Sequence, residues 1–132
     1  KNFTKGNGVL RNETAFRCVP VHFEHCVCID PDFPDTDPGE QFLQWYVEDI
    51  SGCNVTTGLE VASYLSPTPA PGTGPHRYCL YLFQKCHKPP SETPLIEDTE
   101  GRSNFSVINI AKQCGIPFAG NFYLSKSSVR GG

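Results

Sequence analysis

The sequence has no methionine, a single tryptophan and no long apolar run. No apolar stretch approaches the roughly 20 residues that a membrane-spanning helix needs. No run of lysine or arginine exceeds two residues and the formal net charge is −3, which excludes the basic patches that bind nucleic acid or anionic membranes. Because no initiator methionine is present and the first residue is Lys1, we expect that a signal segment was removed ahead of it.

A chain of 132 residues is long enough for one domain and too short for two independent cores. Its 12 glycines and 12 prolines favour strands joined by irregular loops and leave little room for long helices. We therefore expect a mostly β fold. The predicted organisation is an exposed lead-in or edge segment at 1–18, one domain at 19–124 and a flexible tail at 125–132.

Two features indicate an oxidising compartment: seven cysteines in a short chain and four N-x-[ST] acceptors, Asn2, Asn12, Asn54 and Asn104. We expect a secreted, glycosylated protein; the alternative is a cytosolic protein with buried free thiols. An odd count leaves at least one cysteine unpaired or bonded to another chain, with Cys79 as the candidate for a buried free thiol. Cys26 and Cys28 would face the same side of a strand and so need different disulfide partners.

Hydrophobic alternation and turn residues predict the elements of the chain. One face of the first strand would carry Val21, Phe23, Val27 and Ile29, interrupted by His25. A helix should begin at Ser103 or Asn104 as N-cap and end before Gly115. The polar residues 87–101 are expected to form a loop. Predicted strands cover 19–30, 41–50, 76–84 and 117–124, with a brief apolar stretch at 61–65.

Two segments carry polar groups suited to binding a small anion. Asp30 and Asp32 sit where the first strand runs into a proline-rich loop, which holds their carboxylates at a sheet edge. The turn Gly72-Thr73-Gly74 exposes backbone N–H groups, which form anion-binding concavities in such turns. His76 follows that turn, and Tyr78 lies on the same face of the next strand. We predict that the two segments meet and form one anion pocket.

Three stretches resemble the phosphatidylethanolamine-binding protein family. D-P-D-F-P at Asp30 to Pro34 is similar to the family's D-P-D-x-P signature. P-A-P-G-T-G-P-H-R-Y at Pro69 to Tyr78 is similar to its P-P-x-G-T-G-x-H-R-Y signature, which is the specific one. The third is the closing pattern from Phe105 to Tyr123, a short helix followed by P-F-A-G-N-F-Y. The resemblance covers about residues 20–124.

The resemblance implies a mostly β fold: an antiparallel β-sandwich of two packed sheets with one or two short helices. It also implies a binding protein with no cofactor, whose ligand is a phospholipid headgroup or a similar phosphate or carboxylate compound. A histidine of the family is replaced here by Gln44, and a glycine early in the second signature by Thr68. The expected ligand-binding residues are Asp30, Asp32, Pro34, Gln44, Gly72, His76, Tyr78 and Tyr123.

Plainer interpretations stand beside these. His22, His25, Cys26 and Cys28 do not predict a metal site, because alternation along a strand puts the two histidines on opposite faces. His76 alone would more often be a core histidine, and an Asp-Pro loop is often only a turn. We expect no enzyme, since no nucleophile with an adjacent base is visible. The alternative function is a structural or interaction protein, such as part of an extracellular assembly or a protease inhibitor, that keeps the fold without a working pocket and binds a protein partner.

Overall fold

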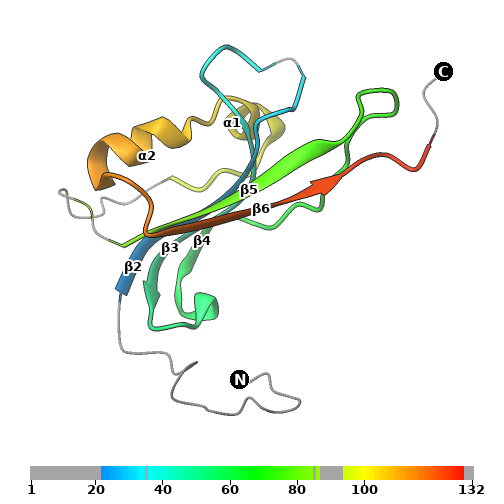
Figure 1. The fold of residues 1–132 in the computed structure, drawn as a ribbon. Helices are drawn as coiled ribbons and strands as arrows, with labels where there is room; N and C mark the ends of the chain where they lie inside the picture. Colours follow the sequence, from blue (N-terminus) through cyan, green and yellow to red (C-terminus); the bar gives the residue numbers. More distant parts are fainter. Residues whose placement is uncertain (1–21, 35, 85, 87–93, 130–132) are drawn as a thin grey trace, which may run out of the picture.

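One antiparallel sheet dominates the computed structural model, which describes residues 22–34, 36–84, 86 and 94–129 (Figure 1). Its five strands have the order β4-β3-β2-β5-β6, and every neighbouring pair is antiparallel. The elements, in chain order, are β2 (His22–Asp30), β3 (Phe42–Ser51), the 3₁₀ turn η2 (Val55–Thr57), β4 (Leu59–Ala62), β5 (His76–Phe83), α1 (Thr99–Ser103), α2 (Val107–Cys114) and β6 (Ala119–Ser125).

The mostly β, antiparallel architecture with two short helices is confirmed. The strand bounds agree with the predicted ones to within a few residues, and β6 runs through Ser125, the first residue of the predicted tail. A second packed sheet, which the family resemblance implies, is not among the described residues. Within the same residues, no helix is long and apolar enough to cross a membrane.

The main core lies between the sheet and the two helices, which cover one of its faces (Figure 1). In β2, Val27 and Ile29 lie two positions apart and point to this face, as period-two patterning predicts. In β3, Leu43 and Tyr46 lie three positions apart, because the strand pairing shifts between them. Its buried members are Val27, Ile29, Leu43, Tyr46, Val61, Ala62, Phe83 and Ile110.

A second, smaller cluster of Phe23, Val47 and Ile50 lies on the opposite face of the sheet. The prediction that Phe23 shares a face with Val27 was wrong. Asp49 adopts a left-handed φ of 60°, which breaks the alternation, so Ile50 points to the same side as Val47. Phe23 pairs with Ile50 and follows it to that side.

The helical region differs from its prediction in two ways. Residues 87–101 were expected to form a loop, but α1 begins at Thr99 with Asp98 as its N-cap, whose carboxylate accepts from the Gly101 N–H at 2.7 Å. The second helix starts at Val107, not next to Ser103 or Asn104. Phe105 forms a β-bridge with Gln41, and the Gln41 side chain accepts from the Val107 N–H at 3.0 Å. A distant glutamine thus replaces the local cap.

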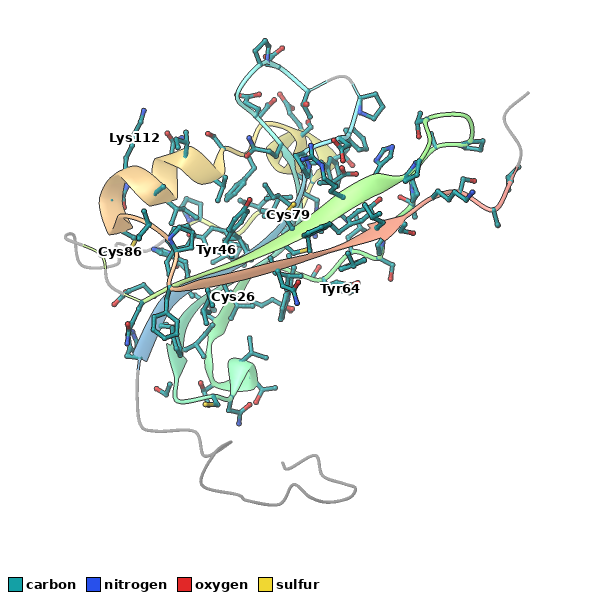
Figure 2. The ribbon with its side chains drawn as sticks, viewed as in Figure 1. Cys26, Tyr46, Tyr64, Cys79, Cys86 and Lys112 are labelled. Atoms are coloured by element: carbon teal, nitrogen blue, oxygen red, sulfur yellow. A yellow bond between two sulfur atoms is a disulfide. The ribbon has the colours of Figure 1, made fainter. Side chains whose placement is uncertain are left out.

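The cysteines divide into bonded and free ones (Figure 2). Cys86 is bonded to Cys114, which joins the chain after β5 to the end of α2, and Cys53 also takes part in a disulfide. Among the described residues, the free thiols are Cys26, Cys28 and Cys79. Cys79 is therefore free as predicted, although half-buried. Cys26 and Cys28 form no disulfide with the described residues, and strand pairing places them opposite Val47, Trp45, Leu80 and Leu82.

Candidate functional site

The end of β2 and the start of β5 lie side by side, because these two strands are antiparallel neighbours. This places Asp30, the last residue of β2, against His76, the first residue of β5. Asp30 Oδ2 lies 2.8 Å from His76 Nδ1, and both side chains are 2% exposed. The two segments that carry the polar groups therefore meet, as the sequence predicts.

The glycine turn before β5 closes over the other side of the His76 ring. Gly72 and Gly74 have φ of 84° and 78°, values that favour glycine over any residue with a side chain. Between them, the Thr73 hydroxyl donates to the Ala70 carbonyl at 2.6 Å and lies 2.8 Å from His76 Nε2. Both ring nitrogens of His76 thus have partners within the protein.

Arg77 holds the second carboxylate, that of Asp32. The Arg77 backbone N–H and Nε donate to Asp32 Oδ2 at 2.8 and 3.0 Å, and Nη2 donates to Oδ1 at 2.8 Å. These hydrogen bonds hold the pKa of Asp32 at about 2, below its usual range. Sequence reasoning missed Arg77 as a site residue, although its place beside His76 in the second signature was a signal.

Tyr78 and Tyr123 form the aromatic side of the site. Tyr78 is buried, and its ring stacks on His76 at 6.4 Å and on Tyr123 at 5.4 Å between centroids. Burial, followed by the charge of Asp30, raises the pKa of the Tyr78 hydroxyl. Burial and a hydrogen bond to Tyr64 likewise raise the pKa of Tyr123, which remains 38% exposed at the surface.

This geometry agrees with comparisons of the whole chain. A family model described as "Phosphatidylethanolamine-binding protein" matches residues 25–114. The chain belongs to this family. The "26 kDa secreted antigen" of Toxocara canis is 35% identical over 108 residues, which is 76% of the chain and 41% of that protein. The "Putative odorant-binding protein A5" of Drosophila melanogaster is 27% identical over 132 residues, or 96% of the chain and 63% of that protein.

Solved structures share the fold of this phosphatidylethanolamine-binding protein domain. The solution structure of CG7054 has a TM-score of 0.62 and 32% identity, covering 81% of the chain and 64% of its own. A carboxypeptidase Y inhibitor, solved in complex with the cognate proteinase, has a TM-score of 0.56 and 19% identity over 81% of the chain and 61% of its own, which supports the fold alone. The chain thus spans about two fifths to two thirds of the length of these relatives.

Gln44, which replaces the family's histidine, is buried and engaged elsewhere. Strand pairing skips Gln44, since Cys28 faces Trp45 and Ile29 faces Leu43, so a bulge forms there. The Gln44 side-chain amide donates to the Leu65 carbonyl at 2.6 Å, and the Gln44 backbone carbonyl accepts from the Leu65 N–H at 2.8 Å. Side chain and backbone of Gln44 together hold the segment after β4.

Few of the polar groups brought together at the candidate site are exposed. Asp30, His76 and Tyr78 are each 2% exposed or less. Gly72, Thr73 and Gly74 are exposed, as are Arg77 and Pro34. The exposed surface of the site therefore consists of the glycine turn, the Arg77 side chain and Pro34, with Thr73 between solvent and His76 Nε2.

A buried arginine that sequence reasoning missed supports the base of the site. Arg102 of α1 is 6% exposed and donates to the carbonyl oxygens of Leu43 and Ser63 at 3.1 and 2.9 Å, and of Gln44 at 3.4 Å. It thereby ties α1 to the bulge in β3 and to the segment after β4. No sequence pattern marked it, because a lone arginine in a polar stretch is usually exposed.

Two of the four predicted glycosylation acceptors lie in the described part of the chain. Asn54 is exposed as the N-cap of η2, and Asn104 is exposed at the end of α1. Asn2 and Asn12 lie outside the described residues.

Proposed function

We propose that this chain is an extracellular binding protein that takes a small anionic group, such as the phosphate of a phospholipid headgroup, at His76. The observation that carries the proposal is the buried Asp30–His76 pair directly behind the exposed Gly72-Thr73-Gly74 turn. Asp30 fixes the ring, so that Nε2 points at the position of the Thr73 hydroxyl. An anion oxygen at that position would accept from Nε2 and from backbone N–H groups of the turn.

The surrounding residues have defined roles in this proposal. Asp32 holds Arg77 at the rim, where a guanidinium group attracts and orients an anion. The Tyr78 ring stacks on the His76 ring and limits its movement, and the Tyr123 ring stacks on Tyr78. We propose that the exposed Pro34 lines the entrance to the site and that Gly72, which has no side chain, leaves room there for the ligand. Gln44 shapes the base through its bond to Leu65, without contacting the ligand.

An extracellular location is supported by the cysteines and by the relatives. The described residues contain the disulfide between Cys86 and Cys114, and one relative is named a secreted antigen. Disulfides of this kind persist in oxidising compartments. Mass spectrometry of the natural protein, before and after reduction and deglycosylation, tests this part of the proposal. An unchanged mass after both treatments would contradict it.

Calorimetric titration with phosphoethanolamine tests the binding site. We expect saturable binding in the natural chain and its loss in His76→Ala. His22→Ala, which changes an exposed histidine on the far part of β2, serves as the matched control and should bind normally. Thr73→Ala should bind at least as well as the natural chain, because it removes the group that competes for Nε2. Equal affinity for inorganic phosphate would identify a free-anion site, whereas preference for phosphoethanolamine would identify a headgroup site.

The second candidate function is a structural or interaction protein without a working pocket. It is favoured by the hydrogen bonds that the site residues already make within the protein. His76 Nε2 is paired with the Thr73 hydroxyl, and the Gln44 side-chain amide is paired with the Leu65 carbonyl. Failure of every titration, with His76→Ala indistinguishable from the natural chain, would support this candidate and overturn the first.

A further inference from the structure

A second cluster of reactive side chains lies on the helix-covered face of the sheet, toward the start of β2. His25 comes from β2, Cys86 from the chain after β5, and Cys114 from the last position of α2. One potential ligand atom from each, a ring nitrogen and two sulfurs, lies within 4.8 Å of the others. His25 is buried and the two cysteines are half-buried, so the cluster is shielded without being closed to solvent.

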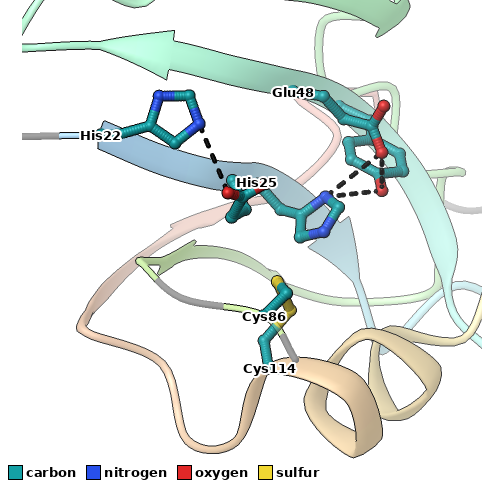
Figure 3. The surroundings of a disulfide bond; sticks show 7 residues. His22, His25, Glu48, Cys86 and Cys114 are labelled. Carbon is teal, nitrogen blue, oxygen red and sulfur yellow. Dashed lines mark hydrogen bonds and ion pairs between the residues drawn. A yellow bond between two sulfur atoms is a disulfide. The ribbon is translucent and has the colours of Figure 1, made fainter. Parts of the chain in front are cut away.

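Two other buried residues, Tyr46 and Glu48, fix the orientation of the His25 ring through polar contacts. His25 Nδ1 lies 2.9 Å from the Tyr46 hydroxyl and 3.3 Å from Glu48 Oε2, and Tyr46 donates to the same Glu48 oxygen at 2.8 Å. Because both of these contacts are made by Nδ1, the other ring nitrogen, Nε2, is left to bind a metal ion. Figure 3 shows the His25 ring between Glu48 and the disulfide, with that second nitrogen toward the sulfur atoms.

We propose that His25, Cys86 and Cys114 form a redox-gated binding site for a soft divalent cation of the Zn²⁺ type. Two thiolates and an imidazole are the ligands such an ion prefers. In the disulfide form described here the sulfur atoms are bonded to each other, and the site is closed. Opening the bridge supplies both sulfur ligands at once.

The gating step balances as an ordinary two-electron exchange. A dithiol reductant gives two electrons and two protons to the Cys86–Cys114 bond and is itself oxidised to a disulfide. The bridge becomes two thiols, and binding of one divalent cation then releases their two protons to solvent. An oxidant that takes two electrons from the thiolates expels the cation and reforms the bridge.

The existing geometry leaves only a small adjustment for binding. Bond lengths of about 2.3 Å to sulfur and 2.0–2.1 Å to nitrogen put tetrahedral ligand atoms roughly 3.6–3.8 Å apart. The three atoms are already within 4.8 Å, so the two sulfurs need only separate while His25 stays in place. Glu48 and Tyr46 supply the outer hydrogen bonds that a metal-bound histidine normally has. A water molecule would fill the fourth position.

This site could not be inferred from the sequence. The pattern of His22, His25, Cys26 and Cys28 pointed away from a metal, and Cys26 and Cys28 indeed remain outside the cluster. Only the packing of α2 against the sheet brings Cys114 and Cys86 to His25. The ligands come from three segments with no common sequence spacing.

Zinc titration of the oxidised and phosphine-reduced full chain tests the proposal. We expect one zinc ion per reduced chain and none per oxidised chain. The oxidised protein is an internal control, since it keeps the free thiols Cys26, Cys28 and Cys79. Equal binding in both forms would place the ion on those thiols and overturn the proposal.

Variants identify the ligands in the reduced protein. His25→Ala and Cys114→Ser should each weaken zinc binding more than tenfold, and Glu48→Gln should weaken it about tenfold through the orientation of His25. His22→Ala is the matched histidine control and should change nothing. Unchanged affinity in both His25→Ala and Cys114→Ser would contradict the proposal.

X-ray absorption of zinc bound to the natural reduced chain needs no substitution and remains decisive if a variant fails to fold. The expected shell has two sulfur atoms with nitrogen and oxygen making up the rest. A shell of four sulfurs, or of oxygen alone, would overturn the site. Should the reduced chain lose its structure, circular dichroism must show that zinc restores it, and failure to do so would count against the proposal.

Discussion

The carboxylate of Asp30 lies 2.8 Å from Nδ1 of His76, a residue 46 positions away, and neither side chain is more than 2% exposed. The pair joins the central strand of the sheet, β2, to its neighbour β5 at the point where the glycine turn enters β5. It is a structural contact, and in the proposed function it is also the contact that orients His76.

Removal of the Asp30 carboxylate is expected to destabilise the fold strongly. Asp30→Ala leaves the buried His76 ring and the Asp32 N–H without their acceptor. Losing one partner of a buried pair costs about 3–5 kcal/mol in free energy of unfolding. Urea denaturation measures the change, and Asp37→Ala, at an exposed position of the same loop, should alter it by less than about 0.5 kcal/mol. Equal stability of the two variants would contradict the structural role.

The Asp32–Arg77 pair predicts a pH dependence of stability. The pKa of Asp32 in the folded chain is about 2, below its unfolded value of 3.8, so its contribution is complete above about pH 5 and is lost as pH falls through 2. Asp32→Asn should therefore lower the free energy of unfolding near neutral pH and have a much smaller effect at pH 2. Because the Arg77 side chain is 56% exposed, the difference should be about 1 kcal/mol or less. Denaturation at pH 2, 3, 4 and 6 measures it, and a difference that grows as pH falls would contradict this assignment.

Arg102 should be far more sensitive to substitution than other cations of the helical region. Arg102→Leu keeps the aliphatic bulk but removes the donor to the buried Leu43 carbonyl and to the Ser63 carbonyl. The expected loss in free energy of unfolding is about 2–3 kcal/mol. Lys112→Leu, at an exposed position of α2, is the control and should remain within about 0.5 kcal/mol of the natural chain.

The Cys86–Cys114 disulfide should contribute to stability through the unfolded state. It closes a loop with a sequence separation of 28, for which chain entropy gives about 3–4 kcal/mol. The double variant Cys86→Ala, Cys114→Ala should lose that amount in denaturation without metal. Cys79→Ala, which removes a free thiol, leaves the bridge intact and should cost far less. A double variant as stable as the natural chain would show that the bridge does not constrain the unfolded state.

Much of the sheet was predictable because its signals are local. Strand alternation placed β2, β3 and β5 to within a few residues, and Gly115 marked the end of α2. The start of α2 was not predictable, since its cap is the side chain of Gln41, far away in the chain. The face of the sheet on which Phe23 packs was not predictable either, because it depends on the backbone conformation of Asp49 in the neighbouring strand.

At the candidate site, the contact between the two signature segments was predictable, whereas the participation of Arg77 and Arg102 was not. Asp30, His76 and Tyr78 come together, as the two signatures indicate. That Arg77 would take the Asp32 carboxylate, and that Gln44 would bond to Leu65, depends on loop positions that no single motif contains.

By itself, the sequence determined the family, the antiparallel strands and the identity of the residues at the end of β2 and the start of β5, because each rests on neighbours along the chain. The tertiary structure decided which polar atoms are already paired: Thr73 with His76, Arg102 with three carbonyl groups, and Cys86 with Cys114 beside His25. Hydrogen bonds and disulfides depend on separations of a few ångströms between distant segments, and only the packed fold sets those separations.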